Sequence, residues 1–307
     1  MPKLRLLLIG QNEFGRAALD AFMDRGHVVA DVFCAPDKPG AKPDPLKVGA
    51  QARGVQVHQF ASLRGEEAHD CMRRAAPDLV VMAYVLQFAP ASLLRIPRLG
   101  AIQYHPSLLP RHRGPSAISW AIASGGTRTG VSIFRPTDGL DEGPILAQKP
   151  CDIGADETLG ELYFNKLFPM GIEALIETAE QVAEGHAPEH VQERDTASYE
   201  GWLRDESAQV HWGLHVDVLY NLIRACNPAP GAWTTIAGTR VRLYECRKLP
   251  TPTFGSVAGA PGTIAAVTPT SIVFNAIGGR IEVLRLRPEG GAKMAAGEFA
   301  AKVGLKA

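Results

Sequence analysis

The sequence predicts an α/β protein in which a doubly wound, mostly parallel open sheet is followed by a smaller β-rich domain. Two patterns support this prediction. Up to about residue 185, short apolar runs alternate with stretches of helical periodicity, whereas after residue 207 short alternating runs are separated by Gly, Pro and Thr turns. The 307 residues, 46% apolar and 21% charged, are typical of a globular chain with room for two domains.

The chain begins with a strand–helix–strand unit. The apolar run LRLLLI at 4–9 predicts a buried strand, and apolar residues recur at helical spacing within 13–27. The run VVADVFCAP at 28–36 is rich in β-branched residues and predicts a second strand. Such a unit places its two strands parallel with a right-handed crossover, which sets the direction of the sheet.

Further strands and helices alternate along the first domain. The run DLVVMAY predicts another buried strand, and GAIQYHPS predicts one that ends in polar residues. The strands are predicted at 78–84, 100–107 and 130–136, and the helices at 66–75, about 115–124, and 157–185 with a break or kink at Pro169.

We expect a first domain at 1–185, a linker at 186–206 and a second domain at 207–307. Residues 186–206 lose the helical periodicity that precedes them, which is typical of a connecting segment. In the second domain, a helix at 214–225 precedes short alternating strands. This order predicts a small β-barrel or sandwich.

Charge and cysteine content limit the classes of function. The formal net charge is zero, but residues 207–307 carry 11 Lys and Arg against 5 Asp and Glu, a balance that is compatible with an RNA-facing module without requiring one. The five cysteines form no C-x-x-C pair, which argues against a disulfide framework or a zinc site. The N-terminus has too few apolar residues for a signal peptide or a membrane span, so we expect a cytoplasmic protein without a membrane partner.

Three polar side chains alternate at the end of one predicted strand. Gln103, His105 and Ser107 would share a face, because successive side chains of a strand point to opposite sides. The carboxyl ends of such strands bind ligands in open α/β sheets, where an amide and an imidazole can stabilise an oxyanion. The alternative is that His105 is a structural histidine with its hydrogen bonds satisfied, and the residues alone leave both readings open.

The segment DGLDEGPI supplies two carboxylates after the strand predicted at 130–136. Asp138 and Asp141 lie between glycines, where the backbone can approach a ligand and a carboxylate can accept a proton or order a water. As a bare pattern the segment is equally typical of a β-turn.

Patterns for a dinucleotide or a metal are weak. IGQNEFG is not G-x-G-x-x-G, and no acidic residue follows at the expected distance, so we predict no NAD. Two histidine pairs have i, i+4 spacing, but Pro188 interrupts the first and neither has neighbouring Cys or carboxylate ligands. We therefore predict no metal site; the pairs are His186/His190 and His211/His215.

The segments YHPSLLPRHRG and DGLDEG, with IGQNEFG, APDKPGAKPDPLKVGA and NPAPGAWT, resemble the folate-dependent formyltransferase superfamily along essentially the whole chain. Within it, the similarity is greatest to the hydrolase domain of 10-formyltetrahydrofolate dehydrogenase and extends to methionyl-tRNA formyltransferase. The resemblance implies a Rossmann-like formyltransferase domain followed by a small barrel similar to an OB fold. It also implies transfer of the formyl group of 10-formyltetrahydrofolate to an amine or to water, without a metal.

By matching position, His105 resembles the catalytic histidine of this superfamily and Asp141 its essential aspartate. His105 and the Gln103 amide would stabilise the oxyanion of a tetrahedral intermediate, while Asp141 would order the nucleophile and help to move its proton. Transferases of the superfamily usually carry Asn where this chain has Gln103. The residues expected to contact folate are Met82, Tyr84, Gln87, Phe88, Ala89, Ser107, Leu108, Leu109, Pro110, Asp138 and Gly139.

The preferred function is therefore formyl transfer from 10-formyltetrahydrofolate to water or to a small amine. One alternative is a methionyl-tRNA formyltransferase, with tRNA as a partner of the basic C-terminal domain. The other is a folate- or RNA-binding protein without catalysis. The sequence leaves open the acceptor, the effect of Gln103, the oligomeric state and the role of the C-terminal domain.

Overall fold

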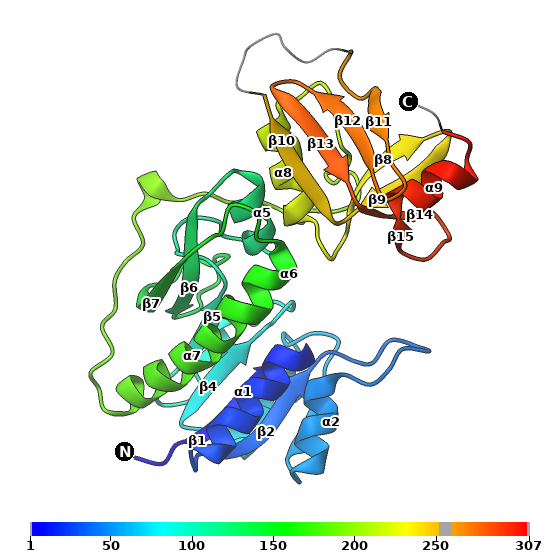
Figure 1. Ribbon diagram of the computed structural model, residues 1–307. Helices are drawn as coiled ribbons and strands as arrows, with labels where there is room; N and C mark the ends of the chain where they lie inside the picture. The colour runs from blue at the N-terminus through cyan, green and yellow to red at the C-terminus, as the bar shows by residue number, and fades with distance from the viewer. Residues whose placement is uncertain (1, 252–258, 306–307) are drawn as a thin grey trace. The chain divides into compact units, whose positions relative to one another are not determined.

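The computed structural model describes residues 2–251 and 259–305, and the chain divides into two compact units (Figure 1). Part of the second domain expected at 207–307, namely 252–258 and 306–307, lies outside the described residues. The units do not follow the order of the chain. The first comprises Met1–Ala117, Thr129–Cys151 and Phe164–Glu200, and the second Ile118–Arg128, Asp152–Tyr163 and Gly201–Ala307.

The first unit is built on a seven-stranded sheet of order β3-β2-β1-β4-β5-β6-β7, which confirms the predicted mostly parallel α/β architecture. The pairs from β3 to β5 are parallel, and β6 runs antiparallel to β5. The strand order reverses between β1 and β4, and open α/β sheets bind ligands at the carboxyl ends of strands at such a point. The strands are β1 Arg5–Gly10, β2 Val28–Cys34, β3 Gln56–Gln59, β4 Leu79–Ala83, β5 Ala101–His105, β6 Arg128–Phe134 and β7 Ile145–Asp152.

Helices cover this sheet and continue into irregular turns. The break expected at Pro169 is present as a change of helix type. A π-helical turn at Tyr163–Leu167 (η1) precedes α7, and Pro169 is the second residue of α7. A proline is tolerated there because the first N–H groups of a helix have no intrahelical partner. The helices of the first unit are α1 Asn12–Asp24, α2 Pro45–Ala52, α3 Glu66–Ala75, α4 Ala91–Leu94, α7 Phe168–Ala183 and the 3-10 turn η2 Arg194–Thr196, whereas α5 Ala117–Ala123 (from residue 118) and α6 Leu159–Leu162 belong to the second unit.

Helix α7 packs closely on β4 and β5, the strands that lead to the candidate site (Figure 1). Tyr104 of β5 stacks on Phe14 of α1, with ring centroids 4.2 Å apart. A Cβ on Gly171 of α7 would lie 2.4 Å from the Tyr104 ring. The absence of a side chain at Gly171 therefore allows β5 and α7 to approach, and it fixes the face of β5 opposite Gln103 and His105.

The second unit contains two antiparallel four-stranded sheets, of order β10-β13-β12-β11 and β15-β14-β9-β8. Their apolar side chains and those of α8 form one buried cluster that includes Leu219, Ile223, Leu243, Ile281 and Val283. This arrangement is compatible with the small barrel predicted from the sequence. The elements are α8 Val216–Ala225, β8 Ala232–Ile236, β9 Thr239–Leu243, β10 Cys246–Pro250, β11 Ile264–Val267, β12 Ile272–Ala276, β13 Gly279–Val283, β14 Arg285–Pro288, β15 Met294–Ala295 and α9 Ala296–Lys302.

Within the described part of the chain, no helix has the length and apolar character needed to cross a bilayer.

Gly171→Ala is expected to lower the free energy of unfolding by about 1–3 kcal/mol, because the added methyl group overpacks against Tyr104. Urea denaturation measures the change. Gly49→Ala is the matched control: this helical glycine faces only the flexible Arg16 side chain, so the better helix propensity of alanine should leave stability equal or higher. Equal stability of the Gly171 variant and the native protein would contradict the packing argument.

Asp205 of the second unit makes ion pairs with Arg242 and Arg240, and these hydrogen bonds hold the pKa of its carboxyl below the usual range. A depressed pKa stabilises the fold above the unfolded value of about 4, and this stabilisation is lost as the pH falls through the folded value. Asp205→Asn should therefore cost about 1 kcal/mol or less at pH 7, because the side chain is partly exposed. The cost measured by urea denaturation should shrink progressively as the pH falls below about 4, and a pH-independent cost would contradict this assignment.

Candidate active site

The predicted site residues meet at the carboxyl end of β5. His105 is the last residue of that strand, and Asp141 lies in the connection between β6 and β7. Both side chains are buried, and His105 Nδ1 lies 3.6 Å from Asp141 Oδ2. Residues separated by 36 positions in the sequence thus face each other at an edge of the sheet that is suited to ligand binding.

A backbone hydrogen bond fixes the tautomer of His105. Its Nε2 lies 2.8 Å from the carbonyl oxygen of His112. A carbonyl oxygen only accepts, so Nε2 carries the hydrogen and Nδ1 is the nitrogen that faces Asp141. The available chemistry of the imidazole is therefore directed towards the carboxylate and the space beside it.

Asp141 is held in a sparsely populated conformation. Its φ of 53° lies in the left-handed region, and its Oδ2 accepts a hydrogen bond of 2.9 Å from the backbone N–H of Gly114. A non-glycine residue stays in this region only where surrounding contacts hold it there. The 3.6 Å separation of the carboxylate and the His105 imidazole is an ion-pair contact and not a hydrogen bond, so both groups face the same space.

Gln103 shares the His105 face of β5, whereas Ser107 does not extend it. The Gln103 side chain is half-buried and makes no hydrogen bond to any described residue, so its amide can face a ligand. Strand β5 ends at His105, and the fully buried Ser107 donates its hydroxyl hydrogen to the Arg111 carbonyl at 2.7 Å. The alternation expected through residue 107 stops because the chain turns there.

The loop 106–114 that carries the His112 carbonyl is held first by β6 and β7. Ser132 Oγ donates to the Ser107 carbonyl at 2.7 Å and accepts from Leu109 N at 3.0 Å. Gln148 Nε2 donates to the Leu109 carbonyl at 2.9 Å and to Ser132 Oγ at 2.8 Å. These bonds use the polar groups of a buried turn, so the loop is a fixed part of the unit.

The segment 190–200, which we call the strap, holds the same loop from its other side. Its hydroxyl and carboxylate contact His112: Ser198 Oγ accepts from His112 N at 2.8 Å, and Glu200 Oε1 lies 3.2 Å from His112 Nδ1. Three backbone hydrogen bonds also join the strap to residues 110 and 113. The strap falls within the range expected to be a linker, and the sequence offered no periodicity that would have indicated this role.

Gln192 of the strap connects the Asp141 loop with the loop 106–114. Its Nε2 donates to the carbonyls of Asp141 at 2.8 Å and Gly143 at 2.7 Å. Its Oε1 accepts from Arg113 Nη2 at 2.9 Å and Nε at 3.2 Å. One buried amide therefore sets the distance between the Asp141 backbone and the loop on which His105 depends. Sequence reasoning missed Gln192, because a single amide in an aperiodic segment carries no pattern.

The segment expected to contact folate after β4 has one buried and one exposed side. Met82 and Ala89 belong to the buried core cluster of the sheet. Tyr84 has a φ of 60° and is exposed, as are Leu86 and Phe88. The Gln87 side chain is engaged elsewhere, because its Nε2 donates to the carbonyls of Phe60 at 2.7 Å and Ala61 at 3.1 Å.

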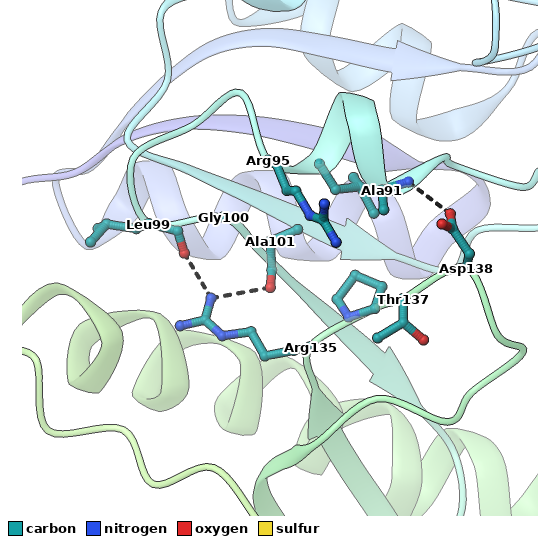
Figure 2. A pocket seen from close by; sticks show the side chains of 10 residues that line it. Ala91, Arg95, Leu99, Gly100, Ala101, Arg135, Thr137 and Asp138 are labelled. Atoms are coloured by element: carbon teal, nitrogen blue, oxygen red, sulfur yellow. Dashed lines mark hydrogen bonds between the residues drawn. The ribbon is translucent and has the colours of Figure 1, made fainter. Parts of the chain in front are cut away.

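A cavity of about 330 Å³ lies between α4, the amino end of β5 and residues 135–138, which lead to the Asp141 loop (Figure 2). Asp138 lies on its wall, where Oδ1 accepts a hydrogen bond of 3.0 Å from Ala91 N. Arg135 Nη1 donates to the carbonyls of Leu99 at 2.7 Å and Ala101 at 3.2 Å, which holds the opposite wall. The remaining lining residues are Leu94, Arg95, Gly100, Pro136 and Thr137.

The remaining residues expected to contact folate lie in two loops, namely the loop 106–114 and the connection between β6 and β7. Leu109 is buried against Phe134 and Ile145, whereas Leu108 and Pro110 are half-buried in the loop. Gly139 follows Asp138, and its N–H donates to Thr137 Oγ1 at 3.2 Å.

Within residues 2–251 and 259–305, no group of three or more His, Cys, Asp or Glu side chains is arranged to hold a metal ion. A Cβ on Gly10 would lie 2.3 Å from the Ala83 carbonyl, so this glycine is required for the packing of β1 against β4.

Comparison with known proteins identifies relatives of the chain. Relatives include human mitochondrial 10-formyltetrahydrofolate dehydrogenase, which is 41% identical over 247 residues, covering 79% of this chain and 27% of the relative. The cytosolic enzyme of Xenopus tropicalis is 34% identical over 307 residues, covering 96% of this chain and 34% of the relative. The chain thus spans about a quarter to a third of the length of these relatives.

Solved structures share the fold. HypX from Aquifex aeolicus, in a variant with four substitutions, superposes with a TM-score of 0.70 at 17% identity, covering 98% of this chain and 49% of that chain. An N-formyltransferase from Helicobacter canadensis, in complex with folinic acid and dTDP-3-aminofucose, gives 0.71 at 16% identity, covering 92% and 99%. A family model for formyl transferase matches residues 3–178, and one for the formyl transferase C-terminal domain matches residues 203–304. The chain belongs to the formyl transferase family of enzymes.

Proposed function

We propose that this enzyme transfers the formyl group of 10-formyltetrahydrofolate to water or to a small amine. The observation that carries the proposal is the buried His105–Asp141 pair, 3.6 Å apart, beside an amide at Gln103 that no described residue engages. The names of the relatives point to the same donor, and HypX from Aquifex aeolicus has been solved with tetrahydrofolic acid.

Part of the folate would occupy the cavity beside Asp138, which lies at the amino end of β5 and is lined by none of Gln103, His105 and Asp141. A flat ring with polar edges needs apolar walls and a few fixed polar groups, and the cavity offers Ala91, Leu94 and Ala101 together with the Asp138 carboxylate. Met82 and Ala89 lie in the core cluster behind this wall. The exposed Tyr84, Phe88 and Leu140, the loop residues Leu108 and Pro110, and Gly139 would flank the rest of the molecule.

The proposed reaction uses the positions of the Gln103 amide, the His105 imidazole and the Asp141 carboxylate. The nucleophile attacks the formyl carbon while its proton passes to the His105–Asp141 pair. The oxyanion that forms accepts hydrogen bonds from the Gln103 amide and from Nδ1–H of the protonated His105. The intermediate collapses when the carbon–nitrogen bond to the folate breaks and the pair returns the proton to that nitrogen. Formate results with water as acceptor, and a formamide with an amine.

Gln103 bears on the choice of acceptor. Glutamine keeps the amide of the usual asparagine but adds one methylene, so its donor reaches about 1 Å or more further from β5. A longer donor leaves less space beside His105 and favours water or a compact amine. Methionyl-tRNA remains the alternative acceptor, for which the positive balance of residues 207–307 is the favouring observation.

His105→Ala and Asp141→Asn are each expected to lower turnover of 10-formyltetrahydrofolate about 10²- to 10⁴-fold, because each removes one half of the acid–base pair. The assay follows tetrahydrofolate and formate with water alone, with added small amines, and with charged methionyl-tRNA. His186→Ala serves as an exposed control and should keep full activity.

Product that forms only with charged tRNA would show that the preferred acceptor is wrong. Folate binding without turnover under any of the three conditions would favour a binding protein.

Gln192→Leu is expected to lower kcat about 10- to 100-fold, because the near-isosteric side chain removes every hydrogen bond that ties the Asp141 backbone to Arg113. The folate KM should change little, since Gln192 is not among the residues that line the cavity. Val191→Ala is the neighbouring control, because Val191 is 87% exposed. A Gln192 variant with native kcat would refute the positioning role, and thermal melting checks that the variant remains folded.

A further inference from the structure

A second cluster of reactive groups lies away from the His105 site, between β2, β3 and α3. His58 of β3 is its centre: Nε2 lies 3.1 Å from Asp31 Oδ2, and Nδ1 lies 3.7 Å from Cys71 Sγ. On the other side of the sulfur, Arg74 Nη2 lies 3.0 Å from Sγ. Carboxylate, imidazole, thiol and guanidinium are therefore in continuous contact.

The carboxylate fixes the direction of proton transfer. Asp31 can only accept, so His58 Nε2 carries the hydrogen and the unprotonated Nδ1 faces the thiol of Cys71. This is the order of contacts that activates a nucleophile: a base touches it, and a third group orients the base and stabilises its charged form. In the parallel β2–β3 pairing Asp31 lies opposite Gln56, two residues before His58, so Asp31 and His58 point to the same face of the sheet and their side chains meet diagonally.

Arg74 stabilises the thiolate that Cys71 becomes when its proton passes to His58. A guanidinium N–H only donates, so the sulfur is its acceptor, and a thiolate accepts far better than a thiol. Arg74 lies exposed in the last turn of α3, whereas Cys71 is 3% exposed. A mobile surface side chain thus covers the sulfur, and only a small reagent can reach it without larger movements.

Three other cysteines have a thiol pKa that is raised from its ordinary value. Burial, reinforced by Asp44 and Asp37, raises the pKa of Cys34 to about 11. Burial raises the pKa of Cys226 to about 12, and it also raises the pKa of Cys246. These three thiols favour the neutral form and serve as internal references.

We propose that Cys71 is a peroxide-reactive nucleophile activated by His58 and Asp31. The thiol proton moves from Sγ to His58 Nδ1, and the sulfur attacks one oxygen of hydrogen peroxide. The sulfur–oxygen bond forms as the oxygen–oxygen bond breaks, so the sulfur loses two electrons to the peroxide. The departing hydroxide takes the proton from Nδ1, giving water, a sulfenic acid at Cys71 and a neutral His58.

The cluster is in contact with the segment that we assign to folate. The His58 ring stacks on Phe60, with centroids 6.0 Å apart and an interplanar angle of 7°. The Phe60 carbonyl in turn accepts the Gln87 hydrogen bond. Oxygen added at Cys71 must displace Arg74 or His58, and the displacement of His58 acts on this chain of contacts.

The full-length protein, treated with hydrogen peroxide and trapped with dimedone, tests the proposal by peptide mass spectrometry. Cys71 should be labelled at least about ten-fold faster than Cys34, Cys226 and Cys246, because its sulfur contacts both an imidazole and a guanidinium. Asp31→Asn keeps the shape of the side chain but removes its charge, and it should slow labelling of Cys71 about ten-fold.

Arg74→Ala distinguishes activation of the Cys71 sulfur by His58 and Asp31 from the access of peroxide to that sulfur. If access alone governs the rate, uncovering the sulfur accelerates labelling and Asp31→Asn has no effect, and this pair of results overturns the proposal. Labelling of Cys71 at the rate of Cys226 overturns it as well. Both measurements are independent of formyl transfer, so the proposal is tested whether or not the assigned reaction is found. Melting temperatures of the variants establish that labelling reports on folded protein.

Discussion

His105 donates its Nε2 hydrogen to the carbonyl of His112, and the remaining chemistry of the site depends on that bond. It decides which imidazole nitrogen faces Asp141, and it exists only while the loop 106–114 keeps its place. The loop has no regular secondary structure of its own, so its place is set by side chains from both flanks. Ser132 and Gln148 hold one flank, and Ser198 and Gln192 of the strap hold the other.

His58 resembles His105 in that an acceptor on Nε2 fixes its tautomer, but a different group faces its Nδ1. At His105 a carbonyl fixes the tautomer and a carboxylate faces Nδ1, so both groups face the same space. At His58 a carboxylate fixes the tautomer and a thiol faces Nδ1, so the imidazole can take a proton from a nucleophile. In both cases the acceptor on Nε2 leaves Nδ1 without a hydrogen, and the group that faces Nδ1 then determines what the imidazole can do.

The strands and helices that could be predicted from the sequence share one property. The hydrophobic pattern that identifies each of them lies within its own residues. The apolar run of β1 and the periodicity of α3 are examples, since burial of one continuous stretch determines both. Strand β3, with the sequence QVHQ, was not predicted because two of its four side chains are amides and the run is short.

The candidate site shows the same limit. His105 and Asp141 could be predicted because they lie in motifs that resemble a known superfamily. Ser107 was assigned to the ligand face because alternation was extended beyond the end of β5. The contacts of Gln192 reach across 49 to 79 residues to backbone carbonyls and to Arg113, and a contact of that kind leaves no periodic trace in the sequence.

The strap also changes where the catalytic unit has to be cut if it is to be studied alone. The last long helix of that unit ends at Ala183, and a fragment that stops there keeps the seven strands of the sheet. Such a fragment loses the amide, the hydroxyl and the carboxylate that the strap supplies to the two loops. It would fold by every spectroscopic measure of helix and strand and yet present a disordered imidazole. The boundary that matters for chemistry lies at Glu200, in a segment with almost no secondary structure.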